Sequence, residues 1–234
     1  MYEYSFRVRY SETDRTGRLS LPGLLAILQD CGYFHGEDRG QGLEFARREK
    51  QTWFLVSWQI YVKKMPSVSE YCTVSTWFYE VRGPLAFTNI LLRDARGEVL
   101  AEGEVVWVYM DLEKGRPMRP PMDSYPPEDR GERWEMEYAP RKIFLPEGAE
   151  RGLPILVDAE QVDTNDHVNN FRYMQLAFRA AGFPEGCRGF RAEYVKQAYL
   201  GEFLTPVVAK VPGEITVSLE DHTGDPCAKF LFLL

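Results

Sequence analysis

Apolar and polar positions follow a clear pattern in the first half of the chain. Residues 4–10 alternate in strand fashion, and leucines recur at helical spacing within residues 21–40, where Pro22 suits a first helical turn. Later segments rich in β-branched and aromatic residues predict four strands, at 53–65, 71–81, 86–94 and 99–110. The pattern therefore predicts a strand, a polar loop, a helix and then a meander of strands.

The second half repeats this order. A strand is predicted at 153–162, followed by a polar loop at 163–170 and a helix at 171–183. The remaining apolar segments predict further strands at 189–200, 203–211, 214–221 and 227–234. At an offset of 149 residues, Asp14 falls on Asp163 and Arg18 on His167. We infer a duplicated α+β unit, in which each helix covers one face of an antiparallel sheet.

A proline-rich segment separates the two halves. Residues 111–139 contain five prolines and many charges, and no apolar periodicity extends over a helix or strand length. The sequence therefore predicts an N-terminal repeat at 1–110, a connector at 111–139 and a C-terminal repeat at 140–234.

Composition and charge exclude several classes of protein. The chain has 234 residues, 44% of them hydrophobic and 27% charged, which is typical of a globular protein. The net charge of −7 argues against nucleic acid as a partner. No apolar stretch is long enough to span a bilayer, so we expect a cytoplasmic protein with no membrane partner. The four cysteines lie outside any CxxC pair, and we expect neither a metal nor a cofactor.

The loop before the second helix is crowded with hydrogen-bonding side chains. Asp163, Asn165 and His167 alternate at a spacing of two, so in an extended loop they can share one side. An imidazole exchanges protons near neutral pH, an amide can donate to a developing oxyanion, and a carboxylate can orient the imidazole. Asn169 and Asn170 are ordinary helix caps on the simplest interpretation.

The segment VDTNDHVNNFRY, residues 162–173, resembles the active-site segment of the acyl-acyl-carrier-protein (acyl-ACP) thioesterases. The stretch EYVKQAYLGE that follows extends the resemblance. It implies a double hotdog fold, with two tandem hotdog repeats, and hydrolysis of acyl-ACP to free fatty acid during fatty acid biosynthesis. The first-half segment SETDRTG resembles the hydroxybenzoyl-CoA type of hotdog thioesterase instead.

One position departs from the family pattern. Where the family carries a Glu that can act as base, often beside a Cys, this chain has Gln197 and Ala198. Neither side chain is a base or a nucleophile. We therefore predict water attack with no acyl-enzyme: His167 as base and then acid, Asn165 on the carbonyl oxygen, Asp163 orienting the imidazole, and Gln197 positioning the water.

Aromatic residues of the first half are candidates for the groove of an acyl pocket beside a degenerate site, namely Trp53, Phe54, Trp58, Trp77, Phe78 and Phe87. The predicted substrate contacts are Trp53, Phe54, Trp58, Asn169 and Tyr173. The other histidines, His35 and His222, are expected on the surface or in loops.

The predicted partner is acyl-loaded acyl carrier protein, with the enzyme a monomer or a homodimer. Because the carrier is acidic, basic pairs are docking candidates: Arg47 and Arg48, Lys63 and Lys64, Arg141 and Lys142. Two alternatives stay open, namely an acyl-CoA or aryl-CoA thioesterase and a non-catalytic acyl-binding protein.

Overall fold

A computed structural model describes all residues, 1–234, and the chain divides into two compact units. Unit 1 comprises Met1–Val56 and Ile60–Tyr138, and unit 2 comprises Ser57–Gln59 and Ala139–Leu234. Residues 111–138, which the sequence predicted as a connector, thus pack within unit 1. None of the helices is both long and apolar enough to cross a membrane.

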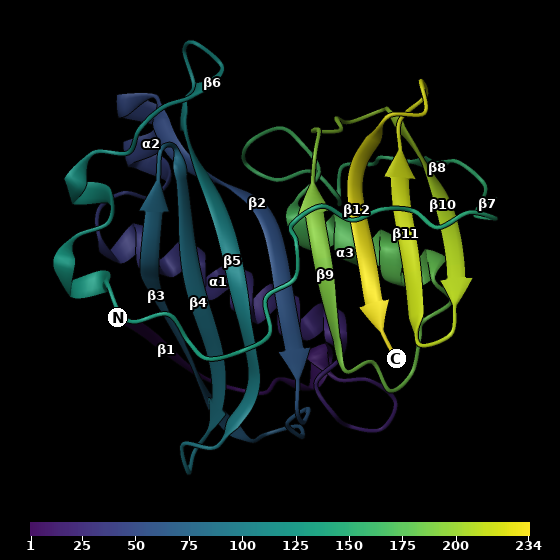
Figure 1. Ribbon diagram of the computed structural model, residues 1–234, viewed down its shortest axis with the longest axis horizontal. Coiled ribbons are helices and arrows are strands. Elements are labelled where there is room, and N and C mark those ends of the chain that lie inside the picture. The colour runs from purple at the N-terminus through teal and green to yellow at the C-terminus, as the bar shows by residue number, and fades with distance from the viewer. The chain divides into compact units, whose positions relative to one another are not determined.

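Unit 1 is an antiparallel sheet with a long helix on one face (Figure 1). Its strands are β1 Tyr2–Arg7, β2 Gln51–Val62, β3 Tyr71–Arg82, β4 Leu85–Asp94, β5 Val99–Asp111 and the short β6 Arg116–Pro117. Their order is β1-β3-β4-β5-β2, with β6 paired to β5. Helix α1, Leu21–Asp38, packs on β3 and β1, and a second helix, α2, spans Leu43–Glu49. Short 3-10 helices occupy Tyr10–Glu12, Met122–Ser124 and Pro127–Asp129.

Helix α1 begins where its sequence predicts. The Ser20 side chain accepts a hydrogen bond from the Gly23 amide at 3.1 Å and so caps the helix. Glycine is needed at position 23, because a Cβ there would approach the Glu12 carbonyl oxygen to 2.6 Å. Leu24, Leu25 and Leu28 are buried against the sheet. This confirms the helix expected from the leucine spacing.

Unit 2 has the same kind of architecture. Helix α3, Asn170–Ala180, packs on β10, β11 and β12 (Figure 1). The strands are β7 Glu150–Arg151, β8 Ile155–Leu156, β9 Gly189–Tyr194, β10 Phe203–Val211, β11 Glu214–Glu220 and β12 Pro226–Leu233. The order is β9-β12-β11-β10-β7, and β8 also pairs with β10. A helix on an antiparallel sheet is the arrangement that a hotdog fold requires.

Two predicted strands are shorter than expected. The strand predicted at 153–162 is reduced to β8, because Pro154 precedes it and the residues after Val157 turn back on themselves. Strand β9 ends at Tyr194, because the amides of Val195 and Lys196 both donate to the Cys227 carbonyl, at 2.9 and 3.1 Å. The chain bends there, and this bend sets the direction of the segment that carries Gln197.

Candidate functional site

The polar loop before α3 is a tight turn built around Asp163. The Asp163 amide donates to the His167 carbonyl at 3.1 Å, and the Asp166 amide donates to the Asp163 carbonyl at 3.0 Å. Asp166 takes a φ of 62° to close this turn. The Asp163 Oδ1 accepts from the Asn165 amide at 2.8 Å. The carboxylate therefore holds the turn, with Asn165 exposed at its tip.

Asn169 ends the loop and starts the helix. Its Oδ1 accepts from the Phe171 amide at 2.8 Å, which makes it the N-cap and confirms the simplest interpretation of this residue. Its Nδ2 donates to the Asp163 Oδ2 at 3.1 Å. Both carboxylate oxygens of Asp163 are thus engaged by the loop. The prediction that Asn169 contacts substrate stays a prediction.

The imidazole of His167 is half-buried at the edge of this loop. Its Nδ1 lies 3.2 Å from the Val168 carbonyl oxygen. A carbonyl oxygen can only accept, so Nδ1 is the donor in this contact. In the neutral imidazole the lone pair is then on Nε2, which is the tautomer that a general base requires.

A second segment pairs with the loop. The Val168 amide donates to the Ala198 carbonyl at 2.9 Å, and His167 lies opposite Tyr199 in an antiparallel bridge. Val168 and Ala198 are fully buried, so their side chains face the core. Because side chains alternate along paired extended segments, His167, Tyr199 and Gln197 share the other face. The structure therefore brings His167 and Gln197 to diagonal positions on one face.

Tyr173 of helix α3 contacts the segment that carries Gln197. The Tyr173 hydroxyl accepts from the Ala198 amide at 2.8 Å, and its ring is only 3% exposed. The Tyr173 hydroxyl thus holds the segment that carries Gln197, and the prediction that Tyr173 contacts substrate stays a prediction. The positive end of the α3 helix dipole lies next to the same loop, where it favours negative charge.

Tyr199 is a site residue that the sequence predictions missed. Its hydroxyl donates to the Gln197 Oε1 at 2.9 Å. The signal was present in the sequence, since two residues in an extended segment point to the same face. No property of an isolated tyrosine would have distinguished it from the many others in the chain.

Unit 1 contains a cavity of about 70 Å³. Its aromatic wall comprises Trp53, Phe78 and Trp107. Of the strand aromatics predicted as candidates for an acyl groove, Trp53 and Phe78 line this cavity. A strand sends alternate side chains to opposite faces, so Phe54 and Trp58 point away from Trp53, and Trp58 is 2% exposed in the core.

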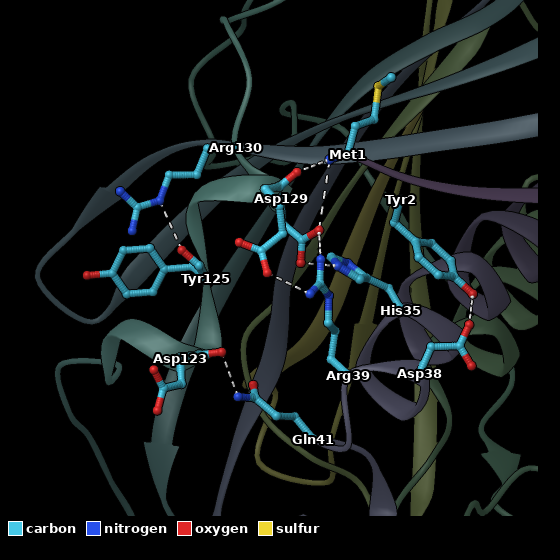
Figure 2. Close-up of polar contacts among 11 residues, drawn as sticks. Met1, Tyr2, His35, Asp38, Arg39, Gln41, Asp123, Tyr125, Asp129 and Arg130 are labelled. Carbon is cyan, nitrogen blue, oxygen red and sulfur yellow. Dashed lines mark hydrogen bonds and ion pairs between the residues drawn. The ribbon is translucent and has the colours of Figure 1, made fainter.

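A buried ionic cluster closes the polar side of the cavity (Figure 2). Asp129 is 2% exposed and accepts from His35 Nε2 at 2.7 Å and from Arg39 at 2.5 Å. Gln41 donates to the Asp123 carbonyl at 2.8 Å, so α1 and its following loop hold residues 123–129 at two points. The expectation that His35 lies on the surface or in a loop is wrong. A carboxylate 94 residues away makes a histidine on α1 compatible with burial.

Burial lowers the pKa of His35, although the hydrogen bond and charge of Asp129 oppose this effect. The lowered pKa favours the neutral form of the imidazole at the cavity. His222, by contrast, lies exposed in the turn between β11 and β12, as expected.

The cysteines do not offer a nucleophile. All four are free thiols, and Cys31, Cys72 and Cys227 are buried. Burial raises the pKa of Cys31 to about 12 and that of Cys227 to about 11. These thiols stay protonated at neutral pH, which makes them poor nucleophiles.

Residues 1–126 match the family model for the acyl-ACP thioesterase N-terminal domain, which is more than half of the chain. The chain belongs to the acyl-ACP thioesterase family. As a member of this family it is a thioester hydrolase, and the matched residues include α1 and most of the cavity wall. The loop with His167 and the segment with Gln197 lie outside the match.

Solved structures of acyl-ACP thioesterases share this fold. An acyl-ACP thioesterase from Bacteroides thetaiotaomicron superposes with a TM-score of 0.87 at 23% identity, over 99% of this chain and 96% of that one. The 12:0-ACP thioesterase from Umbellularia californica superposes with a TM-score of 0.84 at 17% identity, over the same shares of the two chains. A comparison with curated protein sequences finds no significant match.

Proposed function

We propose that this thioesterase hydrolyses acyl-ACP to free fatty acid and carrier protein during fatty acid biosynthesis. The observation that carries the proposal is the paired segment at the start of α3, which sets His167 diagonal to Gln197. Family membership supplies the reaction class. The solved relatives whose names specify acyl-ACP or 12:0-ACP support the choice of carrier.

In the proposed reaction, His167 Nε2 takes a proton from a water whose oxygen attacks the thioester carbonyl carbon. Asn165 and the positive end of the α3 helix dipole stabilise the oxyanion. The carbon–sulfur bond then breaks, and His167 returns the proton to the departing thiolate. Gln197 holds the water. Asp163 acts through the loop, because its two oxygens bind the Asn165 amide and the Asn169 side chain.

The acyl chain is proposed to enter the cavity of unit 1. The apolar wall that an alkyl chain needs is formed by Trp53, Phe78 and Trp107. His35 and Asp129 form the polar side of the cavity. This assignment belongs to a double hotdog in which the N-terminal repeat binds the chain and the C-terminal repeat is catalytic. The helix-on-sheet architecture of each unit supports that proposal.

The acidic carrier is proposed to dock on exposed cations. Arg47 and Arg48 already pair with Glu44 and Glu49, and Lys63 pairs with Glu102. The remaining candidates, Lys64, Arg141 and Lys142, are exposed and make no ion pair. They are therefore better candidates than the paired cations for contacts that add to binding.

The test is a panel of matched acyl-ACP and acyl-CoA thioesters of several chain lengths. We expect a higher kcat/KM for acyl-ACP at every length that the enzyme accepts. Preference for acyl-CoA or aryl-CoA would overturn the choice of carrier. Binding of the thioesters without any hydrolysis would show that Gln197, in place of a carboxylate, has left an acyl-binding protein.

A further inference from the structure

The side-chain amide of Gln197 is hydrogen-bonded through its oxygen and not through its nitrogen. Its Oε1 accepts from the Tyr199 hydroxyl at 2.9 Å. Its Nε2 amino group makes no hydrogen bond to another residue, and Gln197 is half-buried. Because the amide is planar, fixing the oxygen at Tyr199 turns the amino group to the other side. Gln197 thus has a donor available on the side of the amide away from Tyr199.

Tyr199 is itself held firmly. Its amide donates to the Glu202 Oε2 at 2.9 Å, and its carbonyl accepts from the Glu202 amide at 3.1 Å. The bridge to His167 fixes it from the other side. These contacts fix the backbone of Tyr199, and its hydroxyl reaches Gln197 from a side chain that is 46% exposed. A hydroxyl that donates to the oxygen of a neighbouring amide favours one of the two orientations of that amide.

We propose that Tyr199 is a positioning residue, which orients the Gln197 amide so that Nε2 donates to the attacking water. This rests on the proposed function. The water oxygen then uses one lone pair to accept from Nε2 and the other to attack the carbonyl carbon, while one of its protons goes to His167 Nε2. Without Tyr199 the amide can flip and present its oxygen, which cannot hold the water by the same lone pair.

The experiment is a double-mutant cycle of Tyr199→Phe and Gln197→Ala, with kcat and KM measured on an acyl-ACP substrate. In the wild-type background, Tyr199→Phe should lower kcat by roughly 5- to 10-fold, the rate equivalent of one hydrogen bond, with KM unchanged. In the Gln197→Ala background it should have no further effect. An equal loss in both backgrounds, or no loss in the first, would overturn the proposal.

A matched control and a rescue sharpen the cycle. Tyr10→Phe removes a hydroxyl from a side chain that is 86% exposed, and it should leave kcat unchanged. In the Gln197→Glu background, Tyr199→Phe should again change the kinetics. There the hydroxyl stabilises the introduced carboxylate, and its loss should move the acid limb of the kcat/KM profile to higher pH. An unmoved acid limb would contradict the proposed contact.

A measurement without turnover separates this proposal from the proposed function. The NMR order parameter of the Gln197 side-chain nitrogen should be high in the wild type and fall in Tyr199→Phe, while Tyr10→Phe leaves it unchanged. If no thioester is hydrolysed but the order parameter falls, the function is wrong and the orienting contact stands. If hydrolysis proceeds but the order parameter does not change, the positioning role is wrong.

Discussion

The loops that lead into α1 and α3 have the same backbone design and different side chains. In unit 1 the Asp14 amide donates to the Arg18 carbonyl at 2.8 Å, as the Asp163 amide does to the His167 carbonyl at 3.1 Å. Gly17 and Asp166, at equivalent positions, both take positive φ angles, 75° and 62°. The turn therefore serves to start the helix in both units, independently of any catalytic role of its side chains.

The aspartates do the same structural work in both loops. Asp14 Oδ1 accepts from the Thr16 amide at 2.8 Å, and Asp163 Oδ1 accepts from the Asn165 amide at the same distance. Partial burial raises the pKa of Asp14, but hydrogen bonds from Thr16 and Arg18 outweigh it and hold that pKa below its ordinary value. An aspartate at this position is thus explained by folding alone.

What differs is the side chain at the end of the turn. Arg18 donates to the Met65 carbonyl at 3.1 Å, whereas His167 lies beside Gln197 and Tyr199. Ser20 and Asn169 both cap their helices. Once the features common to both loops are set aside, the candidate catalytic residues that remain are Asn165, His167 and Gln197.

The largest expected effect follows from the arginine and histidine at matching positions. His167→Ala should lower kcat by about 10²- to 10⁴-fold, because it removes the proposed proton acceptor. Arg18→Ala, the matched change in unit 1, should leave kcat within about twofold of the wild type, since no reacting group is lost. Steady-state kinetics on acyl-ACP measure both. Comparable losses in the two variants would mean that the loops share a structural role and that the proposed chemistry is wrong.

Unit 1 places its buried polar cluster at the other end of its helix. Asp129→Ala should lower the free energy of unfolding by about 2 kcal/mol, because it leaves His35 and Arg39 without their buried acceptor. Glu128→Ala is the control, because Glu128 pairs with the same Arg39 at 2.9 Å but is 59% exposed. It should cost less than about 0.5 kcal/mol. Urea unfolding of the two variants measures the difference, and equal losses would contradict the importance of burial.

Local sequence patterns were enough to predict much of the fold and part of the candidate site. The leucine spacing predicted α1, and the polar residues at 163–170 predicted the loop before α3. These features depend on neighbours within a few residues. Prediction failed where distant residues decide the outcome. His35 was placed at the surface because nothing near it in sequence reveals Asp129, 94 residues away.

The short elements show the same limit. Helix α2, Leu43–Glu49, was missed because it is too short for helical periodicity to emerge. The bend that ends β9 depends on a carbonyl of β12, which the sequence of β9 does not reveal. The role of Tyr199 depends on that bend and on the bridge to His167, so only the folded chain identifies it.

The two helix N-caps, Ser20 and Asn169, allow a matched test with a smaller expected effect. Ser20→Ala and Asn169→Ala should each lower the free energy of unfolding by about 1 kcal/mol, the usual cost of losing a capping side chain. Only Asn169→Ala should also lower kcat, because it releases the Asp163 Oδ2 that Asn169 holds. Urea unfolding and turnover are measured on the same preparations. An equal loss of turnover in Ser20→Ala would show that the two entrances are functionally alike.

The smallest effect concerns the pH dependence of stability in unit 1. Burial lowers the pKa of His35 in the folded state, so its neutral form stabilises the fold fully above about pH 6.5, and this stability is lost as the pH falls below that value. Burial raises the pKa of Asp129, but hydrogen bonds from His35 and Arg39 outweigh it and lower that pKa. Its contribution is therefore lost in a second step, below about pH 4.

The substitution His35→Gln separates these two acid steps. A glutamine can still donate to Asp129 but does not titrate, so the melting temperature should no longer fall between about pH 6.5 and 5, while the decline below pH 4 remains. If His35→Gln kept the first step, the histidine of unit 1 would not be its source.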